Sequence, residues 1–272
     1  MDLAQRPFWS ARFAGTAALL VVLAACASPA QGPDAVAESA KINDPLEPLN
    51  RAIFGFNLAL DKALLRPVAI AYRDVIPKPG RDGVRNFLDN LETPVVLAND
   101  VLQGSAERAG TTAGRFAINS TIGIAGLLDV AAGMGFKRHD EDFGQTLGVW
   151  GFPEGPYLVL PILGPSPPRD SVGLVVDYFI DPLTYVFDNN DVEWLSFVRF
   201  GVRAVDSRSR SVEALDEIER TSIDFYATVR SFYRQQRADE IRNGEPSPMV
   251  PVPEITLEFE EGGADEVSLV AD

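Results

Sequence analysis

The strongest constraint on the fold is a helical pattern that begins at Asp44-Pro45 and continues to about Leu65. Asp is favoured where a helix is capped at its N-terminus, and Pro fits the first helical turn. At about 100° per residue, the polar side chains fall in one sector of roughly 140°, which leaves an apolar sector of roughly 220°. A surface helix of a soluble protein usually has a narrower apolar stripe.

This wide apolar sector leaves two arrangements open. The helix could be buried on three sides of an ordinary domain, or it could have lipid or protein outside and a water-filled path inside. Unpaired polar groups are costly in hydrocarbon, so in either case the polar stripe must face water or hydrogen-bonding partners. The stripe contains Glu47, Asn50, Arg51, Asn57 and Asp61.

Apolar residues recur at helical spacing through most of the chain up to Arg242, and the expected fold class is therefore all-α. Pro67, Pro77, Pro79 and Gly80 are expected to interrupt the chain after the first helix. Further helices are expected at residues 83–91, 94–102, 105–119, 123–132, 170–180 and 191–205, with one long amphipathic helix at 208–242.

Residues 146–168 contain six prolines, which exclude a continuous helix. We expect a short hairpin in which residues 147–152 pair with residues 157–160 across Pro153-Glu154-Gly155. Its apolar residues include Trp150, Phe152, Tyr157, Leu158 and Leu160. An isolated hairpin this apolar must be covered, either by the helices or by a membrane or protein partner.

The N-terminus has the organisation of a signal peptide over residues 1–25. Arg6 and Arg12 precede a run of small and apolar residues, which is too short for a comfortable membrane span. The run ends in Leu23-Ala24-Ala25-Cys26, which resembles the lipobox of bacterial lipoproteins. Because Cys26 is the only cysteine, we expect cleavage before it and lipidation of its thiol; the alternative is a signal peptide with a chance cysteine. Ala27, where an inner-membrane retention signal would have Asp, indicates the outer membrane.

The two ends of the chain are expected to be unstructured. Residues 26–43 are rich in small and polar residues and predict a tether. Residues 243–272 carry eight acidic side chains and no Lys or Arg, which predicts a disordered acidic tail; a short strand at 254–259 is the alternative. The net charge of −15 argues against unaided nucleic-acid binding and against electrostatic adhesion to an anionic membrane.

The sequence contains no recognisable catalytic or metal-binding constellation. His139 is the only histidine, and its charged neighbours predict a solvated loop rather than a catalytic base. Asp140, Glu141 and Asp142 lack the glycine-turned loop of a cation site. We therefore expect no enzyme activity, no cofactor and no metal.

Several motifs together resemble the MlaA/VacJ lipoproteins. The N-terminal motifs are Asn43–Arg51, Phe54–Asn57, Arg66–Ala69, Asn86–Leu91, Leu102–Gly104 and Arg115–Thr121. The most specific ones are Glu141–Gly148, Gly155–Pro161, Gly164–Ser166 and Arg169-Asp170. The resemblance is firm from about Asn43 to Asp181 and weaker beyond.

The resemblance implies a ring-like, membrane-embedded helical domain in the inner leaflet of the outer membrane. Phospholipids misplaced in the outer leaflet would pass through an amphipathic pore to a periplasmic lipid-binding shuttle protein, which maintains lipid asymmetry. A trimeric porin is the expected partner. The alternative is a structural or assembly lipoprotein that scaffolds an outer-membrane partner without moving lipid.

Combined with the residue patterns, this resemblance gives two site hypotheses. The five stripe residues Glu47, Asn50, Arg51, Asn57 and Asp61 are expected to face the pore. The apolar hairpin, with Trp150, Phe152, Tyr157, Leu158 and Leu160, is expected to seat the ring or to gate the lipid path.

Overall fold

The computed structural model describes residues 43–245. The expected signal peptide, Cys26, almost all of the tether and most of the acidic tail lie outside the described residues. Within the described range, helices account for every regular element except one two-stranded sheet, so the all-α prediction is confirmed.

The N-terminal half is a succession of helices with short connections. It comprises α3 (Glu47–Leu60), the π-helical turn η1 (Asp61–Leu65), α4 (Arg66–Val75), α5 (Lys78–Leu102), α6 (Ala106–Thr121), α7 (Val130–Gly133) and α8 (Phe143–Val149). The strands and the remaining helices are β1 (Val159–Leu160), β2 (Gly164–Pro165), α9 (Pro168–Ile180), α10 (Pro182–Asn189), α11 (Trp194–Arg210), α12 (Val212–Thr221) and α13 (Phe225–Ile241).

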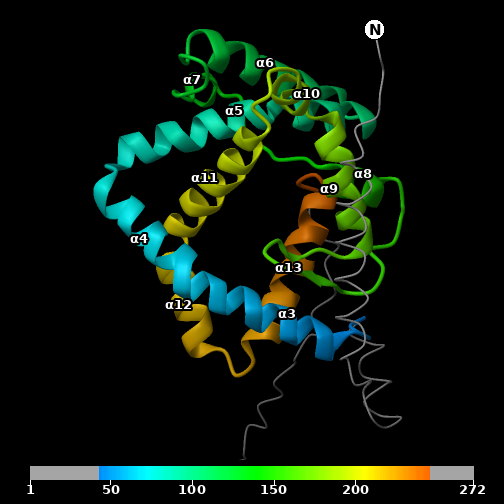
Figure 1. Cartoon of the computed structure of the whole chain (residues 1–272). Helices are drawn as coiled ribbons and strands as arrows, with labels where there is room; N and C mark the ends of the chain where they lie inside the picture. The colour runs from blue at the N-terminus through cyan, green and yellow to red at the C-terminus, as the bar shows by residue number, and fades with distance from the viewer. Residues whose placement is uncertain (1–42, 246–272) are drawn as a thin grey trace, which may run out of the picture.

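The helices are arranged in a ring-like outline (Figure 1). α3, α4 and α5 follow one another around one side, and α8, α9 and α13 form the other. α11 crosses between them and packs on α4 and α5, while α8 packs on α9 and α13. α6 packs on α5 and α7, and α6 and α7 lie together at the top of the view in Figure 1.

The distribution of side chains is the reverse of that in a soluble monomer. Among the described residues, eighteen buried side chains are polar or charged and only ten are hydrophobic. The hydrophobic core is a small cluster of Ile53, Tyr157, Val159 and Tyr226. Large apolar side chains are exposed instead, with Phe197 on α11 reaching 78% exposure. Exposed apolar surface on this scale marks an interaction with membrane, lipid or protein.

No helix within residues 43–245 is long and apolar enough to cross a membrane. The exposed apolar surface is therefore spread over several helix faces rather than gathered in one spanning segment.

Several expected boundaries were wrong because tertiary contacts overrule local signals. α5 continues through Pro94, so the expected break there does not occur. The long helix expected at 208–242 is divided at Ser211 and again at residues 222–224, where Asp224 caps α13 by accepting from Ala227 N–H. The helix expected at 123–132 is mostly turns, because Ile124, Ala125 and Gly126 all have positive φ.

The first helix also begins differently from the prediction. α3 starts at Glu47, and Asp44 does not cap it. The Asp44 carboxylate is fully buried, where it accepts hydrogen bonds from Asn50, from the Tyr226 hydroxyl and from Arg230. Pro67 does not break the chain either, because the π-helical turn η1 leads directly into α4.

The apolar hairpin exists with a different partner strand. Residues 143–149 form α8, so the expected strand at 147–152 is absent. β1 pairs antiparallel with β2, which follows it, and Val159 lies opposite Pro165. The turn passes through Ile162, whose φ of 69° is unusual for a β-branched residue.

Candidate functional site

Two rows of charged side chains face each other between α5 and α11. The α5 row is Asp82, Arg85, Asp89 and Glu92, and the α11 row is Arg203, Asp206 and Arg210. Spacings of three and four residues place each row on one helix face. The pairs run antiparallel, because Arg210 contacts Asp82 whereas Arg203 contacts Asp89 and Glu92.

These rows border an open, water-accessible hollow of about 360 Å³. Arg138 and Asp140, from the segment between α7 and α8, extend the charged lining. We define the charged cleft as this hollow together with nine residues. Its charged lining is Arg85, Asp89, Arg138, Arg203, Asp206 and Arg210. Asp82, Glu92 and Asp140 adjoin that lining through ion pairs with Arg210, Arg203 and Arg138.

Asp89 is the centre of the charged cleft. Its carboxylate forms ion pairs with Arg138, with Arg203 at 3.4 Å and with Arg85 at 3.8 Å. Despite these three cations, burial raises the pKa of Asp89 above its ordinary value. Arg203 also pairs with Glu92. Three elements therefore supply guanidinium groups to one half-buried carboxylate.

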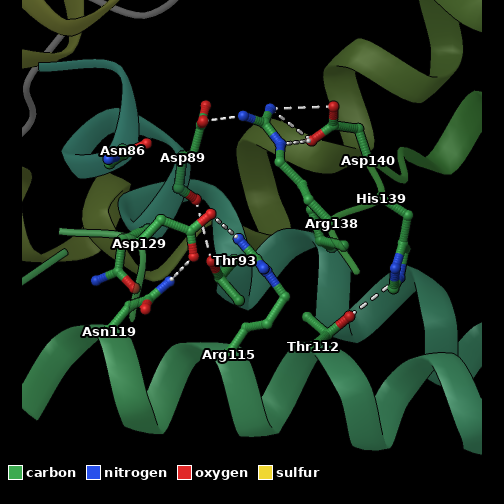
Figure 2. A pocket seen from close by; sticks show the side chains of 12 residues that line it. Asn86, Asp89, Thr93, Thr112, Arg115, Asn119, Asp129, Arg138, His139 and Asp140 are labelled. Carbon is green, nitrogen blue, oxygen red and sulfur yellow. Dashed lines mark hydrogen bonds and ion pairs between the residues drawn. The ribbon is translucent and has the colours of Figure 1, made fainter. Parts of the chain in front are cut away.

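A second, smaller hollow adjoins the charged cleft and shares Asp89 and Arg138 with it (Figure 2). Its wall is formed by hydrogen-bonded polar side chains. Arg115 lies 2.8 Å from Asp129, and Asn119 donates to the same carboxylate at 3.0 Å. Arg138 lies between Asp89 and Asp140 and lines both hollows.

His139 is not the solvated loop residue that the sequence predicted. Its side chain is only 16% exposed, and Nε2 lies 3.0 Å from Asp100 Oδ1 and 3.1 Å from Thr112 Oγ1. These contacts fix the loop that carries Arg138 and Asp140. A third polar hollow, lined by Arg108, Lys137 and Glu141 among others, lies beside the same loop.

The predicted stripe on α3 contacts other protein segments. Asn50 differs from the expectation, because its side chain is fully buried. Its Nδ2 donates to Tyr157 O at 2.9 Å and its Oδ1 accepts from Val159 N–H at 2.9 Å. Asn57 repeats the arrangement, donating to Leu160 O at 2.9 Å and accepting from Ile162 N–H at 2.7 Å.

The spacing of the two asparagines matches that of the hairpin. Seven residues of α-helix from Asn50 to Asn57 advance about 10.5 Å. Three residues of extended chain from Tyr157 to Leu160 advance about 10 Å. The side-chain amides on one side of α3 therefore hydrogen-bond to the backbone of residues 157–162, in place of the backbone groups that a neighbouring strand would offer.

The other three stripe residues form ion pairs. Arg51 lies 2.7 Å from Glu47 and 2.5 Å from Asp224, and its guanidinium stacks over the Tyr226 ring. Asp61 accepts from Arg208 at 2.9 Å. None of the five lines the charged cleft. A pore-facing role for Glu47, Arg51 and Asp61 stays a prediction.

The apolar residues of the predicted hairpin divide into two groups. Tyr157 is buried against the rings of Tyr226 and Tyr233, and Leu158 and Leu160 are half-buried. Trp150 and Phe152 are exposed, at 49% and 55%. At the hairpin turn, Ile162 and Leu163 are exposed as well. The segment therefore has one face on the helices and presents another outward.

Exposed aromatic side chains lie on the same helix as the charged row. Trp194, Phe197 and Phe200 are exposed on α11, one to three turns before Arg203. α9, which α10 connects to α11, exposes further apolar side chains: Val172, Leu174, Val175, Tyr178 and Phe179. Charged and apolar surfaces therefore meet along α11.

The described residues contain no group of three or more His, Cys, Asp or Glu side chains that could hold a metal ion. The predicted weak cation candidates are engaged elsewhere: Asp142 binds Arg237, and Glu141 binds Arg108 and Gln103.

The charged cleft was not predicted from the sequence, although its residues show a periodic signal there. Charges recur at helical spacing in both 82–92 and 203–210. What the sequence did not show is that the two rows face each other.

Residues 42–240 match the model of the MlaA lipoprotein family. The chain belongs to the MlaA lipoprotein family. Its MlaA relatives include the intermembrane phospholipid transport system lipoprotein MlaA of Escherichia coli, 37% identical over 207 residues that cover 74% of this chain and 79% of the relative. The MlaA of Haemophilus influenzae is 33% identical over 209 residues, covering 74% and 80%.

The fold is also similar to an experimental structure. A chain from the study "Structural basis for maintenance of bacterial outer membrane lipid asymmetry" aligns with a TM-score of 0.65 and 37% identity, covering 73% of this chain and 98% of that one. Family membership inferred from the motifs is therefore confirmed.

Proposed function

We propose that this protein is an outer-membrane lipoprotein that removes mislocalised phospholipids from the outer leaflet and passes them to a periplasmic lipid carrier. The MlaA relatives are named for intermembrane phospholipid transport, and the similar solved structure concerns outer-membrane lipid asymmetry. Lipidation of Cys26 would anchor the chain on the periplasmic side of the membrane, and a trimeric porin is the proposed partner.

The observation that carries this proposal is the junction of charged and aromatic surfaces along α11. A phospholipid has a charged headgroup and apolar acyl chains, and moving the headgroup through hydrocarbon without partners is costly. The charged cleft offers ion-pairing partners to the headgroup. Phe197 and Phe200, on the same helix, offer an apolar surface to the acyl chains.

The hairpin is proposed to seat the ring beside this path. Asn50 and Asn57 hold its backbone, and Trp150, Phe152, Ile162 and Leu163 present apolar surface outward. Deleting residues 157–163 is expected to abolish lipid removal while the lipoprotein stays membrane-bound. Normal outer-membrane asymmetry in that deletion would contradict the hairpin role.

The direct test is a lipid-transfer assay with the porin-bound protein and its periplasmic acceptor. The proposal predicts that labelled phospholipid appears on the acceptor only when this protein is present, with its chemical structure unchanged. If the protein assembles with the porin but transfers no lipid, the scaffold alternative replaces transport.

A further inference from the structure

The charged cleft is almost electrically balanced, in contrast to the rest of a strongly acidic chain. Its nine residues comprise four arginines and five carboxylates. Every one of the four arginines already has a carboxylate partner within 4.0 Å. An added anion therefore displaces a carboxylate from a guanidinium and leaves that carboxylate unpaired, which is costly in a half-buried site.

Two of the four arginines are the most exposed, although Arg203 is also held by an ion pair with Glu92. Arg85 and Arg203 are 49% and 37% exposed, and they lie 3.8 and 3.4 Å from Asp89. Both point into the hollow between α5 and α11 as part of its lining. Because of this exposure, these two guanidiniums are the ones that a phosphate diester can reach most directly, and binding to Arg203 releases Glu92.

Carboxylates lie beside these arginines and are positioned to bind a cation. Glu92 and Asp140 are 41% and 68% exposed. Burial raises the pKa of Glu92, and the neighbouring charges of Asp140 and Asp89 raise it further. Such mutual repulsion between carboxylates is relieved by an incoming ammonium group.

We infer that the charged cleft selects zwitterionic phospholipids, with the phosphate on Arg203 and Arg85 and the headgroup ammonium on Glu92 and Asp140. A zwitterion exchanges partners with the existing ion pairs and leaves no charge unpaired. An anionic lipid such as phosphatidylglycerol supplies a phosphate but no ammonium. This inference rests on the proposed function and adds a substrate class to it.

The test measures which lipid the purified, full mature lipoprotein takes up from an equimolar mixture of phosphatidylethanolamine and phosphatidylglycerol. Bound lipid is extracted and quantified by mass spectrometry. The expected preference for phosphatidylethanolamine is about fivefold, the equivalent of one partly exposed ion pair.

Three variants separate the roles of the charges. Glu92→Gln with Asp140→Asn removes the ammonium acceptors and is expected to abolish the preference. Arg203→Gln weakens the phosphate contact that both lipids share, so uptake of both falls with little change in their ratio. The matched control, Glu217→Gln with Asp188→Asn, makes the same charge change outside the charged cleft and keeps the wild-type ratio.

Each outcome decides the question. Equal uptake of both lipids by the wild type overturns the selectivity and leaves phospholipid transport standing. If the control variant changes the ratio of bound lipids as much as Glu92→Gln with Asp140→Asn does, the effect comes from net charge and the selectivity of the charged cleft is also overturned. Uptake of neither lipid contradicts the proposed function itself.

Discussion

Replacing Asn50 with alanine removes three buried hydrogen bonds, two that hold α3 to the hairpin and one that holds Asp44. The Asn50 side chain is fully buried and bonds to Asp44 at 2.8 Å, to Tyr157 O at 2.9 Å and to Val159 N–H at 2.9 Å. Each such bond contributes about 1 kcal/mol net, and leaving buried partners unsatisfied adds about 1–3 kcal/mol. We expect Asn50→Ala to lower the free energy of unfolding by about 3–5 kcal/mol.

The assay is thermal unfolding of the detergent-purified chain, followed by circular dichroism. For a domain of this size, about 1 kcal/mol corresponds to roughly 2–4 °C, so we expect the midpoint to fall by about 10 °C. Asn57→Ala loses two bonds whose Ile162 end is exposed, and is expected to cost about 1–2 kcal/mol.

The control is Asn190→Ala, since the exposed Asn190 side chain follows the end of α10 and donates only to Val186 O in that helix. It is expected to change stability by less than about 0.5 kcal/mol. The reasoning is refuted if Asn50→Ala resembles the control, or if Asn57→Ala is the more damaging of the two.

Three further predictions concern other parts of the molecule. In Gly173→Ala the new Cβ would lie 2.4 Å from Gly144 N, so we expect the free energy of unfolding, measured by thermal unfolding, to fall by about 1–3 kcal/mol. In the control Gly201→Ala the new Cβ has nothing within 4 Å, and this variant should not destabilise the protein. Burial raises the pKa of Asp177 to about 6, above its unfolded value, so its contribution to stability falls as pH rises from about 4 to 6; the melting-point difference between Asp177→Asn and the wild type should grow over this range, and a constant difference would refute the assignment. Phe197→Ser, at a side chain 78% exposed, should change stability by less than about 0.5 kcal/mol yet weaken vesicle binding of a Cys26→Ser chain about tenfold; unchanged binding would show that this face does not meet lipid.

The sequence predicted the features that depend on local interactions. Helical periodicity gave the all-α class, and the motifs from Asn43 to Asp181 identified the family. Single helix-breaking residues such as proline were less reliable predictors of where a helix ends. Pro94 sits inside α5, and Pro67 follows a π-helical turn, because packing holds both helices together around them.

Features that depend on distant segments could not be predicted from the sequence. A polar side chain such as Asn50 on a mostly apolar helix is consistent with a residue that lines a pore. It is equally consistent with a residue that hydrogen-bonds to the backbone of another segment. Only the position of Tyr157, 107 residues away, shows that Asn50 hydrogen-bonds to the hairpin backbone. The charged cleft is a similar case, because Asp89 and Arg203 are 114 residues apart. Whether these two side chains face each other depends on how α11 crosses α5.

The central claim is that headgroups occupy the charged cleft while acyl chains lie on the apolar face of α11. Site-specific photocrosslinking tests it most directly, with a photoreactive amino acid placed at 203, at 197 or at the exposed control position 217. Two lipid probes are used, one labelled in the headgroup and one near the end of an acyl chain. We predict crosslinks from position 203 to the headgroup probe, from 197 to the acyl-chain probe, and from 217 to neither. Crosslinking of the headgroup probe at 197 but not at 203 would contradict the account.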